Sequence, residues 1–456
     1  MPAKYAIRIS PTESRYEPVP KLINIELEHC LGCLECAKRE CIYDVYAKRS
    51  FLSVQLIDTA GSMCKNCMRC VQECKNAIIA KSINPDYLQL GNDYWTPEII
   101  GSLLKQSENG KIPVSGGGYN GPFTGPGFDA IWTDMSAIVR PTRDGIQGRE
   151  YISTSVDIGR KLDFLKFHNS ELESILPAHL SIPMPVILEL PKRADNWSPV
   201  INATLATTHE TGLLMVSSDP TLPPENLIFR TAPGSTPNLT TTYKMVEIYT
   251  LDSFDRKAID ESIRYWTSGF TNTLISVGLA LNELTVNRVL ALIESGVGAI
   301  RLYADRNGNG FGEWSDKFIV DMVRSVHLAM VENGVRDKAS LIAGGGIALP
   351  EHFVKLTACG IDIVVIDEPL LIALECRMCN ECETTRQCPM HLESVPEDWG
   401  RQRIVNMLGS WHSQIVEMLG AMGLREVRRL RGDTGRIMFF KDLERECFGP
   451  IFGNRR

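Results

Sequence analysis

Residues 361–389 read Ile361-Asp-Ile-Val-Val-Ile366, then a short apolar segment at 370–374, then Cys376-Arg-Met-Cys379-Asn-Glu-Cys382-Glu-Thr-Thr-Arg-Gln-Cys388-Pro389. The first part is apolar and β-branched, which predicts a buried strand. Four cysteines within thirteen residues, closed by Cys-Pro, suit thiolate ligation of an iron–sulfur cluster. We expect this cluster to pack against the last strand of a larger fold. A zinc site is the alternative, although zinc ligands usually come as separated pairs.

Two more four-cysteine runs lie near the N-terminus. They are spaced Cys30-x2-Cys33-x2-Cys36-x4-Cys41 and Cys64-x2-Cys67-x2-Cys70-x3-Cys74. This is the spacing of a two-cluster bacterial ferredoxin, in which the fourth cysteine of each run ligates the other cluster. We therefore assign Cys30, Cys33, Cys36 and Cys74 to one 4Fe–4S cluster, and Cys64, Cys67, Cys70 and Cys41 to the other. Neither run has proline after its last cysteine, and two zinc sites are the alternative.

The middle of the chain alternates short apolar segments with helical patterns. The segments that predict strands are Ile112-Pro-Val114, Pro185-Val-Ile-Leu188, Leu213-Leu-Met-Val216, Met245-Val-Glu-Ile248, Leu274-Ile-Ser-Val277, Ala299-Ile-Arg-Leu302, Ser340-Leu-Ile-Ala343 and Ile361 to Ile366, with an extra candidate at Leu227-Ile-Phe229. Alternation repeated about eight times predicts an α/β fold with a parallel sheet, closed as a (β/α)8 TIM barrel. A doubly wound open sheet is the alternative, but no glycine-rich dinucleotide fingerprint follows the first strand.

Two glycine-rich loops follow predicted strands. Ser115, Gly116, Gly117 and Gly118 come after the first predicted strand, and Gly344, Gly345 and Gly346 come after the seventh. In a barrel, the loops that follow the C-terminal ends of the strands hold the active-site residues, and glycines after the seventh strand often bind a phosphate. Arg140, Arg143 and Arg149 follow the first loop and are candidates for binding a phosphate or a dicarboxylate substrate. The alternative is that these arginines bind the long segment between the first two predicted strands to the rim of the barrel.

Composition limits the class of protein. The chain has 456 residues, of which 44 % are hydrophobic and 23 % charged, with a net charge of −7. A negative balance gives no reason to expect nucleic acid as a partner. No apolar run reaches the roughly 20 residues of a membrane span, and no signal peptide is evident, so we expect a cytoplasmic protein. The sequence contains no HExxH motif and no Ser/His/Asp arrangement, which argues against a hydrolase.

With these motifs in place, the chain from about 98 to 440 resembles the FMN-binding synthase domain of glutamate synthase, in its archaeal-type form. The matching pieces are Ile112-Pro-Val-Ser-Gly116, Ala343-Gly-Gly-Gly-Ile347, Ile363 to Ile366, the run Cys376/Cys382/Cys388-Pro389, and the tail from Arg403-Ile-Val-Asn406 to Gly420-Ala-Met-Gly423. The resemblance implies an iron–sulfur flavoprotein oxidoreductase that carries out reductive amination of 2-oxoglutarate at FMN. It implies ferredoxin or another redox protein as electron donor and a separate glutaminase subunit, since nothing here corresponds to a glutaminase domain.

The resemblance predicts three parts: a ferredoxin-like domain with two 4Fe–4S clusters at 1–95, an FMN-binding barrel at 96–370, and a third-cluster segment with a helical tail at 371–456. The family's third cluster is a 3Fe–4S type held by positions that match Cys376, Cys382 and Cys388. Cys379 is an additional thiolate, so we expect 4Fe–4S here, with 3Fe–4S as the alternative.

Two departures from the family raise a second hypothesis. The family's lysine on the fifth strand is Gly278 here, and Asp367-Glu368 stand where a small or basic residue would meet the FMN phosphate. Two carboxylates near a phosphate are unfavourable unless paired or turned away. Arg306 or Lys244 is a candidate to supply the missing charge. The alternative function is an electron-transfer subunit that uses the barrel as a scaffold within a larger redox complex.

Overall fold

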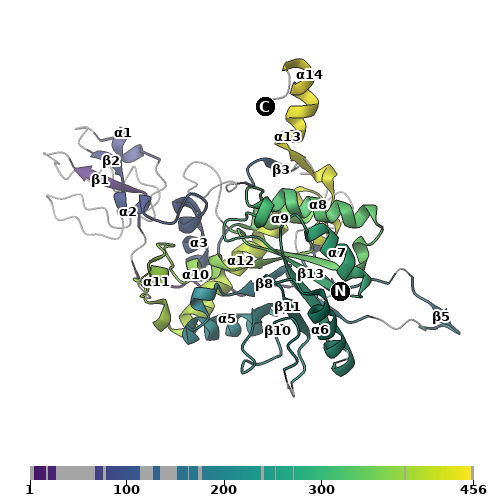
Figure 1. The fold of residues 1–456 in the computed structure, drawn as a ribbon. Helices are drawn as coiled ribbons and strands as arrows, with labels where there is room; N and C mark the ends of the chain where they lie inside the picture. The colour runs from purple at the N-terminus through teal and green to yellow at the C-terminus, as the bar shows by residue number, and fades with distance from the viewer. Residues whose placement is uncertain are drawn as a thin grey trace.

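A computed structural model describes residues 5–16, 19–26, 67–74, 79–112, 127–133, 151–162, 164–172, 177–237, 241–251, 253–270, 272–384 and 387–452. Eight parallel strands close into a barrel, in the order β8-β9-β10-β11-β12-β13-β14-β15 with β15 pairing back to β8 (Figure 1). They are β8 (Val186–Glu189), β9 (Leu214–Ser217), β10 (Leu227–Thr231), β11 (Met245–Tyr249), β12 (Leu274–Ala280), β13 (Ala299–Tyr303), β14 (Ser340–Gly344) and β15 (Ile363–Ile366). The predicted TIM barrel is confirmed.

The identity of one strand differs from the prediction. The barrel closes without Ile112-Pro-Val114, whose first residue follows helix α3 (Pro97–Asn109), whereas the extra candidate Leu227-Ile-Phe229 is the third strand, β10. Among the described residues, no helix separates β9, β10 and β11, so the β/α alternation breaks there. The numbering of the fifth to eighth strands is unaffected, and Gly344–Gly346 do follow the seventh.

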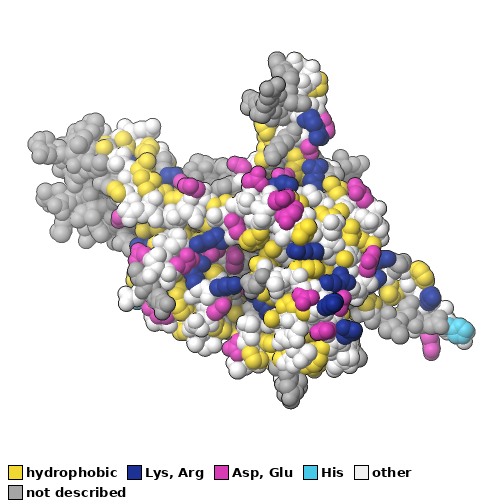
Figure 2. Space-filling view, viewed as in Figure 1, with side chains coloured by type: hydrophobic (Ala, Val, Ile, Leu, Met, Phe, Trp, Pro, Cys, Tyr) yellow, Lys and Arg dark blue, Asp and Glu magenta, His cyan; other side chains and the backbone are white. Residues whose placement is uncertain are grey.

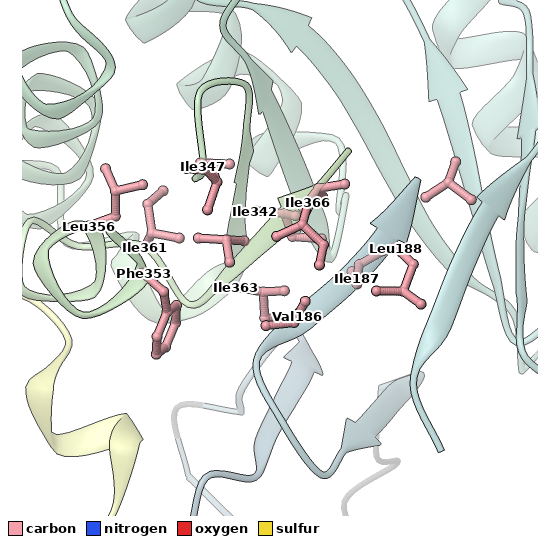
Figure 3. Packing of buried hydrophobic residues seen from close by; sticks show 14 of the residues in the cluster. Val186, Ile187, Leu188, Ile342, Ile347, Phe353, Leu356, Ile361, Ile363 and Ile366 are labelled. Atoms are coloured by element: carbon pink, nitrogen blue, oxygen red, sulfur yellow. The ribbon is translucent and has the colours of Figure 1, made fainter. Parts of the chain in front are cut away.

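Helices cover the outside of the barrel and bury its apolar wall. They are α5 (Ser198–Thr211), α6 (Arg256–Gly269), α7 (Thr285–Glu294), α8 (Ile319–Glu332), α9 (Pro350–Ala358) and α10 (Glu368–Ala373). Figure 3 shows how this core is built: Val186 and Leu188 of β8 lie beside Ile363 and Ile366 of β15, with Phe353 of α9 behind them. All are fully buried, and each such side chain contributes roughly 1.5–3 kcal/mol of hydrophobic free energy.

The long C-terminal helix α12 (Glu397–Ala421) packs against α5, α3 (Pro97–Asn109) and α9. Its stripe of Ile404, Leu408, Trp411 and Ile415 is buried, as the helical spacing predicted. Beyond it, Arg428 and Arg431 bind Asp157, Asp337 and Asp362 at the N-terminal end of the barrel. The arginine-rich segment after α12 is therefore docked on its own chain.

Smaller sheets lie outside the barrel. They are β4 (Val156–Gly159) with β7 (His179–Ile182), the hairpin of β5 (Phe167–His168) with β6 (Glu171–Leu172), and β3 (Ile131–Thr133) with β16 (Ile437–Phe439). In Figure 1 the β5–β6 hairpin projects from one side, and α13 (Phe440–Leu443) and α14 (Gly449–Phe452) project from another. Both projections stand clear of the barrel.

The N-terminal part contributes an arm and a two-stranded sheet. Residues 5–16 are extended and lie along the C-terminal region, with the Tyr5 hydroxyl donating to the Thr211 carbonyl at 2.9 Å. Strand β1 (Leu22–Glu26) pairs antiparallel with β2 (Ile79–Ile83), and the short helices α1 (Arg69–Gln72) and α2 (Pro85–Leu88) flank β2 in sequence. Most residues of the two predicted ferredoxin runs lie outside the described residues.

Charged side chains of both signs are interspersed over the face shown in Figure 2, where no single-sign patch dominates. Within the described residues, none of the helices combines the length and apolarity needed to cross a membrane.

Asn406 ties the N-terminal arm to the core. Its side-chain amide donates to the Ser10 and Ser107 carbonyls at 2.8 and 2.9 Å and accepts from the Ser10 N–H at 3.0 Å, in a fully buried position. We expect Asn406→Ala to lower the free energy of unfolding by about 3 kcal/mol, because it leaves buried polar groups unpaired. Asp398→Ala on the same helix, whose side chain is 98 % exposed, is the control. Equal stability of the two variants in urea unfolding would contradict this account.

Candidate functional site

The candidate site lies at the C-terminal end of the barrel strands. Because all eight strands are parallel, the loops that follow β8, β13, β14 and β15 meet at this end. They carry Arg193, Arg306, the Gly344–Gly346 loop, and Asp367 with Glu368. The cysteine run 376–388 follows α10 and reaches the same place.

An ion-pair group links this end of the barrel to the cysteine run. We call it the Glu368 group; it consists of Arg193, Arg306, Glu368 and Glu383. Arg193 binds both carboxylate oxygens of Glu368, one of them at 2.8 Å. Arg306 lies 3.5 Å from Glu368 and 3.4 Å from Glu383, which directly follows Cys382. The Glu368 side chain is only 3 % exposed, so its charge depends on these two arginines.

The cysteine run begins as an irregular loop and includes the short helix α11 (Glu381–Thr384), which carries Cys382 and Glu383. Non-glycine residues with left-handed backbone, Glu375, Met378 and Asn380, alternate with the cysteines at φ values of 76°, 56° and 60°. Cys376 and Cys388 are buried, Cys382 is half-buried and Cys379 is exposed. Residues held in such conformations mark functional loops, because the surrounding structure must impose them.

The thiols of the run influence one another. Burial raises the pKa of Cys376 to about 12 and also raises that of Cys382, and the neighbouring Cys388 adds to both. Arg193 opposes these shifts at both thiols, and a backbone hydrogen bond from Met378 does so at Cys376. Thiols, a cation and a backbone donor are the surroundings that an anionic iron–sulfur cluster uses. The residues therefore fit a cluster.

The assignment of the cluster ligands stays a prediction. Among the described ranges, no three His, Cys, Asp or Glu side chains stand close enough to share one metal ion. Of the N-terminal runs, Cys67, Cys70 and Cys74 are described; Cys70 lies within α1, with Cys67 before the helix and Cys74 after it. The other five predicted ligands, Cys30, Cys33, Cys36, Cys41 and Cys64, lie outside the described residues.

The Gly344–Gly346 loop is tightly packed by the loop after β13. A Cβ at Gly345 would lie 2.5 Å from the Asp305 carbonyl oxygen, and one at Gly346 would lie 2.6 Å from the Gly308 nitrogen. Both glycines also have positive φ, 103° and 70°. The packing of these two loops therefore requires glycine, and the assignment of the loop to FMN stays a prediction.

Donors for a phosphate are nevertheless present here. Among the described residues, no backbone acceptor is found for the Gly346 N–H. Nη2 of Arg306 is buried and lacks a hydrogen-bond partner, whereas its Nε lies 3.5 Å from Glu368. Buried donors without acceptors are rare in folded proteins, and together these groups fit an anion such as the phosphate of FMN.

The two carboxylates after β15 do not oppose an anion as the sequence suggested. Glu368 is neutralised by Arg193 and Arg306. Burial, together with Glu368, raises the pKa of Asp367 to about 7, and its Oδ1 accepts the Glu368 N–H at 2.6 Å at the start of α10. One carboxylate is therefore paired, and the other is partly protonated at neutral pH.

A second charge network fills the inside of the barrel below the site. It consists of Glu189, Arg230, Glu247, Arg301 and Tyr303. Arg301 contacts Glu189 and, at 3.1 Å, Glu247. Arg230 lies 3.0 Å from Glu247 and donates to the Tyr303 hydroxyl at 2.8 Å. Burial opposes ionisation of Glu247, but Arg230 and Arg301 lower its pKa to about 2.

This network explains Gly278. A Cβ at Gly278 would lie 2.7 Å from Cε2 of Tyr303, so the tyrosine ring occupies the space of a side chain there. Two cations of the network lie near Gly278. Arg301 pairs in register with Gly278 on the neighbouring strand, and Arg230 lies on β10. Lys244 precedes β11 and is exposed at the opposite end of the barrel, so it cannot supply the missing charge.

This network and Arg193 were not predicted from the sequence. The available signal was a charged residue inside an otherwise apolar strand: Glu247 in Met-Val-Glu-Ile-Tyr and Arg301 in Ala-Ile-Arg-Leu-Tyr. Such a charge is costly to bury unless it is paired, so each of these positions implied a partner. The predicted site residues Ser115–Gly118, Arg140, Arg143 and Arg149 lie outside the described residues.

The segment before α3 completes the site. The Gly91 N–H donates to the Arg377 carbonyl at 3.1 Å, within the cysteine run. The Tyr94 hydroxyl donates to the Gly346 carbonyl, and the Trp95 indole N–H donates to the Arg306 carbonyl at 2.9 Å. The chain that leads away from the β1–β2 sheet therefore contacts both the cysteine run and the glycine loop.

The raised pKa of Asp367 predicts a pH-dependent stability. The folded protein retains a proton that the unfolded chain releases near pH 4, so stability falls as pH rises from about 4 to about 7 and is then constant. We expect Asp367→Asn, which keeps the capping oxygen, to gain stability relative to the wild type across this window, by at most roughly 4 kcal/mol at pH 8. Urea unfolding at pH 5, 6, 7 and 8 measures the difference. A difference that does not change with pH would refute the shifted pKa.

Gly278→Ala is expected to destabilise the barrel by about 1–3 kcal/mol, because the added methyl group meets the fixed Tyr303 ring. The cost should shrink in a Tyr303→Ala background, which a double-mutant cycle detects as a coupling energy. Gly101→Ala is the matched control, since nothing lies within 4 Å of a Cβ there. Additive effects at 278 and 303 would contradict the contact.

Comparison with known proteins relates part of the C-terminal half of the chain to one protein family. The family model described as the conserved region in glutamate synthase matches residues 319–425. Solved structures of a flavocytochrome b2 with benzoylformate (TM-score 0.45, 12 % identity, 72 % of this chain and 82 % of that one) and of a mandelate oxidase variant with (S)-mandelic acid (TM-score 0.39, 13 % identity, 66 % and 97 %) are similar.

Relatives cover nearly the whole chain. An archaeal glutamate synthase (NADPH) of Archaeoglobus fulgidus is 25 % identical over 94 % of this chain and 96 % of its own length. Archaeal-type glutamate synthases (NADPH) of Dehalococcoides mccartyi and Thermotoga maritima are each 23 % identical over 89 % of this chain, and over 92 % and 91 % of their own lengths. Over most of its length the chain is thus similar to the archaeal-type glutamate synthases, and its residues 319–425 match the conserved region in glutamate synthase.

Proposed function

We propose that the protein is an iron–sulfur flavoprotein oxidoreductase of the glutamate synthase kind, which reduces an imine or carbonyl group at FMN with electrons relayed through its clusters. The observation that carries this proposal is the Glu368 group. It fixes a four-cysteine loop directly against the end of the barrel where (β/α)8 enzymes hold their substrates. A structural role for the loop alone does not call for four thiols beside that end.

The chain's own residues have distinct parts in this function. The Gly346 N–H, with the unpartnered Nη2 of Arg306, would hold the FMN phosphate. Arg301 and Arg230 supply positive charge below the site, where the glutamate synthases that the sequence resembles carry a lysine. FMN, when bound, supplies hydride transfer, and the clusters supply single electrons.

The route of electrons follows the chain. Residues 84–95 leave strand β2 of the N-terminal sheet and contact the cysteine run at Arg377 and the glycine loop at Gly346. A module in that position delivers electrons first to the run 376–388 and then to the barrel. Ferredoxin or another redox protein, or NADPH as named for the relatives, is the external donor that the proposal requires.

A second candidate function is an electron-transfer subunit without substrate chemistry. The observation that favours it is the self-contained barrel network, in which Glu189 and Glu247 already neutralise Arg230 and Arg301. A substrate carboxylate would have to compete with these two carboxylates. The two candidates differ in flavin content and in turnover.

The first experiment is to purify the protein anaerobically and to quantify flavin, iron and sulfide per chain. About one FMN and about twelve irons support the flavoenzyme. Turnover is then measured with 2-oxoglutarate and ammonia or glutamine, using reduced ferredoxin or NADPH. Full iron without flavin would overturn the flavoenzyme and favour the electron-transfer subunit.

Cysteine variants test the third cluster separately. We expect Cys376→Ser and Cys388→Ser to lower the iron content from about twelve to about eight per chain, because each removes a buried ligand of one cluster only. Cys447→Ser is the control, since that exposed cysteine lies outside all three runs. An unchanged iron content in the first two variants would show that the run holds no cluster.

A further inference from the structure

We propose that Arg193 is a positioning residue that raises the reduction potential of the cluster held by the run 376–388, and that Glu368 is the counter-ion that limits this effect. The inference rests on the third cluster of the proposed function and goes beyond it. It names the charge that sets the cluster's potential.

Arg193 is held in one place by contacts on two sides. On the barrel side, both of its Nη atoms bind the Glu368 carboxylate, which begins α10 directly after β15. On the cysteine side, its Nη2 lies 3.8 Å from the Met378 sulfur and its Nη1 lies 3.9 Å from Glu383. The side chain is 13 % exposed, so water screens its charge weakly.

The charge of Arg193 lies beside the predicted ligands of the run. Arg193 contacts Met378, which directly precedes Cys379, and Glu383, which directly follows Cys382. Because Arg193 and Glu368 carry opposite charges, they have opposite effects on negative charge at this part of the run. Arg306 contacts Asn380 at 3.2 Å and shares the Glu368 and Glu383 carboxylates with Arg193.

Reduction of an iron–sulfur cluster by one electron adds one negative charge to it. A cation fixed beside the ligating sulfurs stabilises the reduced form more than the oxidised form and so raises the potential. A nearby carboxylate has the reverse effect. Because Arg193 and Glu368 follow different strands, β8 and β15, the end of the barrel itself sets the local charge at the cluster.

The test is a redox titration of the anaerobically purified holoprotein, followed by electron paramagnetic resonance with dithionite as the one-electron reductant. The spectrum of Cys376→Ser identifies the signal of the third cluster by its loss. We expect Arg193→Gln to shift that cluster's midpoint to lower potential and Glu368→Gln to shift it to higher potential. Arg193→Lys, which keeps the charge but not the two-pronged contact, should fall between the wild type and Arg193→Gln.

Arg256→Gln is the matched control, because it removes an arginine–carboxylate pair on the outer helix α6 and should leave the midpoint unchanged. Thermal unfolding of each variant establishes that it is folded. Glu368→Gln keeps an acceptor for Arg193, so it tests the charge even where Arg193→Gln is unstable.

The outcomes separate this inference from the proposed function. If the third-cluster signal is present and neither Arg193→Gln nor Glu368→Gln moves its midpoint, the inference is wrong and the proposed function stands. Equal downward shifts in Arg193→Gln and Arg193→Lys would also overturn it, because geometry rather than charge would then be responsible. A wild-type protein with about eight irons and no signal that Cys376→Ser removes would instead refute the third cluster.

Discussion

A single buried carboxylate, Glu368, constrains the whole functional end of this molecule. A charge that is 3 % exposed is tolerated only when cations are brought to it, and here two arginines from different loops converge on it. Arg193 lies in the loop after the first barrel strand, and Arg306 lies in the loop after the sixth. Because both also contact Glu383, the cysteine run is fixed relative to the barrel by the same ion pairs.

The barrel could be predicted from the sequence because its strands are short, apolar and β-branched, and seven of the eight were identified directly. The remaining assignment failed for a physical reason. Ile112-Pro-Val114 and Leu227-Ile-Phe229 carry equally short local signals, and only long-range pairing with β9 and β11 makes the second a barrel strand. The position of the cysteine run after the last strand was predictable, because it follows from chain order alone.

The candidate site was less predictable, because its character depends on which charges meet. Considered alone, Gly278 replaces the lysine of the family that the sequence resembles. Asp367-Glu368 place two carboxylates where the FMN phosphate was expected. In the structure Gly278 makes room for the Tyr303 ring, and Glu368 holds Arg193 and Arg306 at the site. Partners separated by more than a hundred residues, such as Glu189 and Arg301, cannot be matched without the fold. The sequence shows that these charges need partners, and the structure shows which ones they have.

The N-terminal arm has a consequence for how the protein is made. Residues 5–16 rest on Glu375, Trp399 and Asn406, all of which are synthesised near the end of translation. This arm therefore waits for the long helix α12, made much later, before all of its contacts can form, even though the β1–β2 pairing joins residues 22–26 to 79–83. A chain that stops short of α12 would leave the arm without its contacts to Trp399 and Asn406.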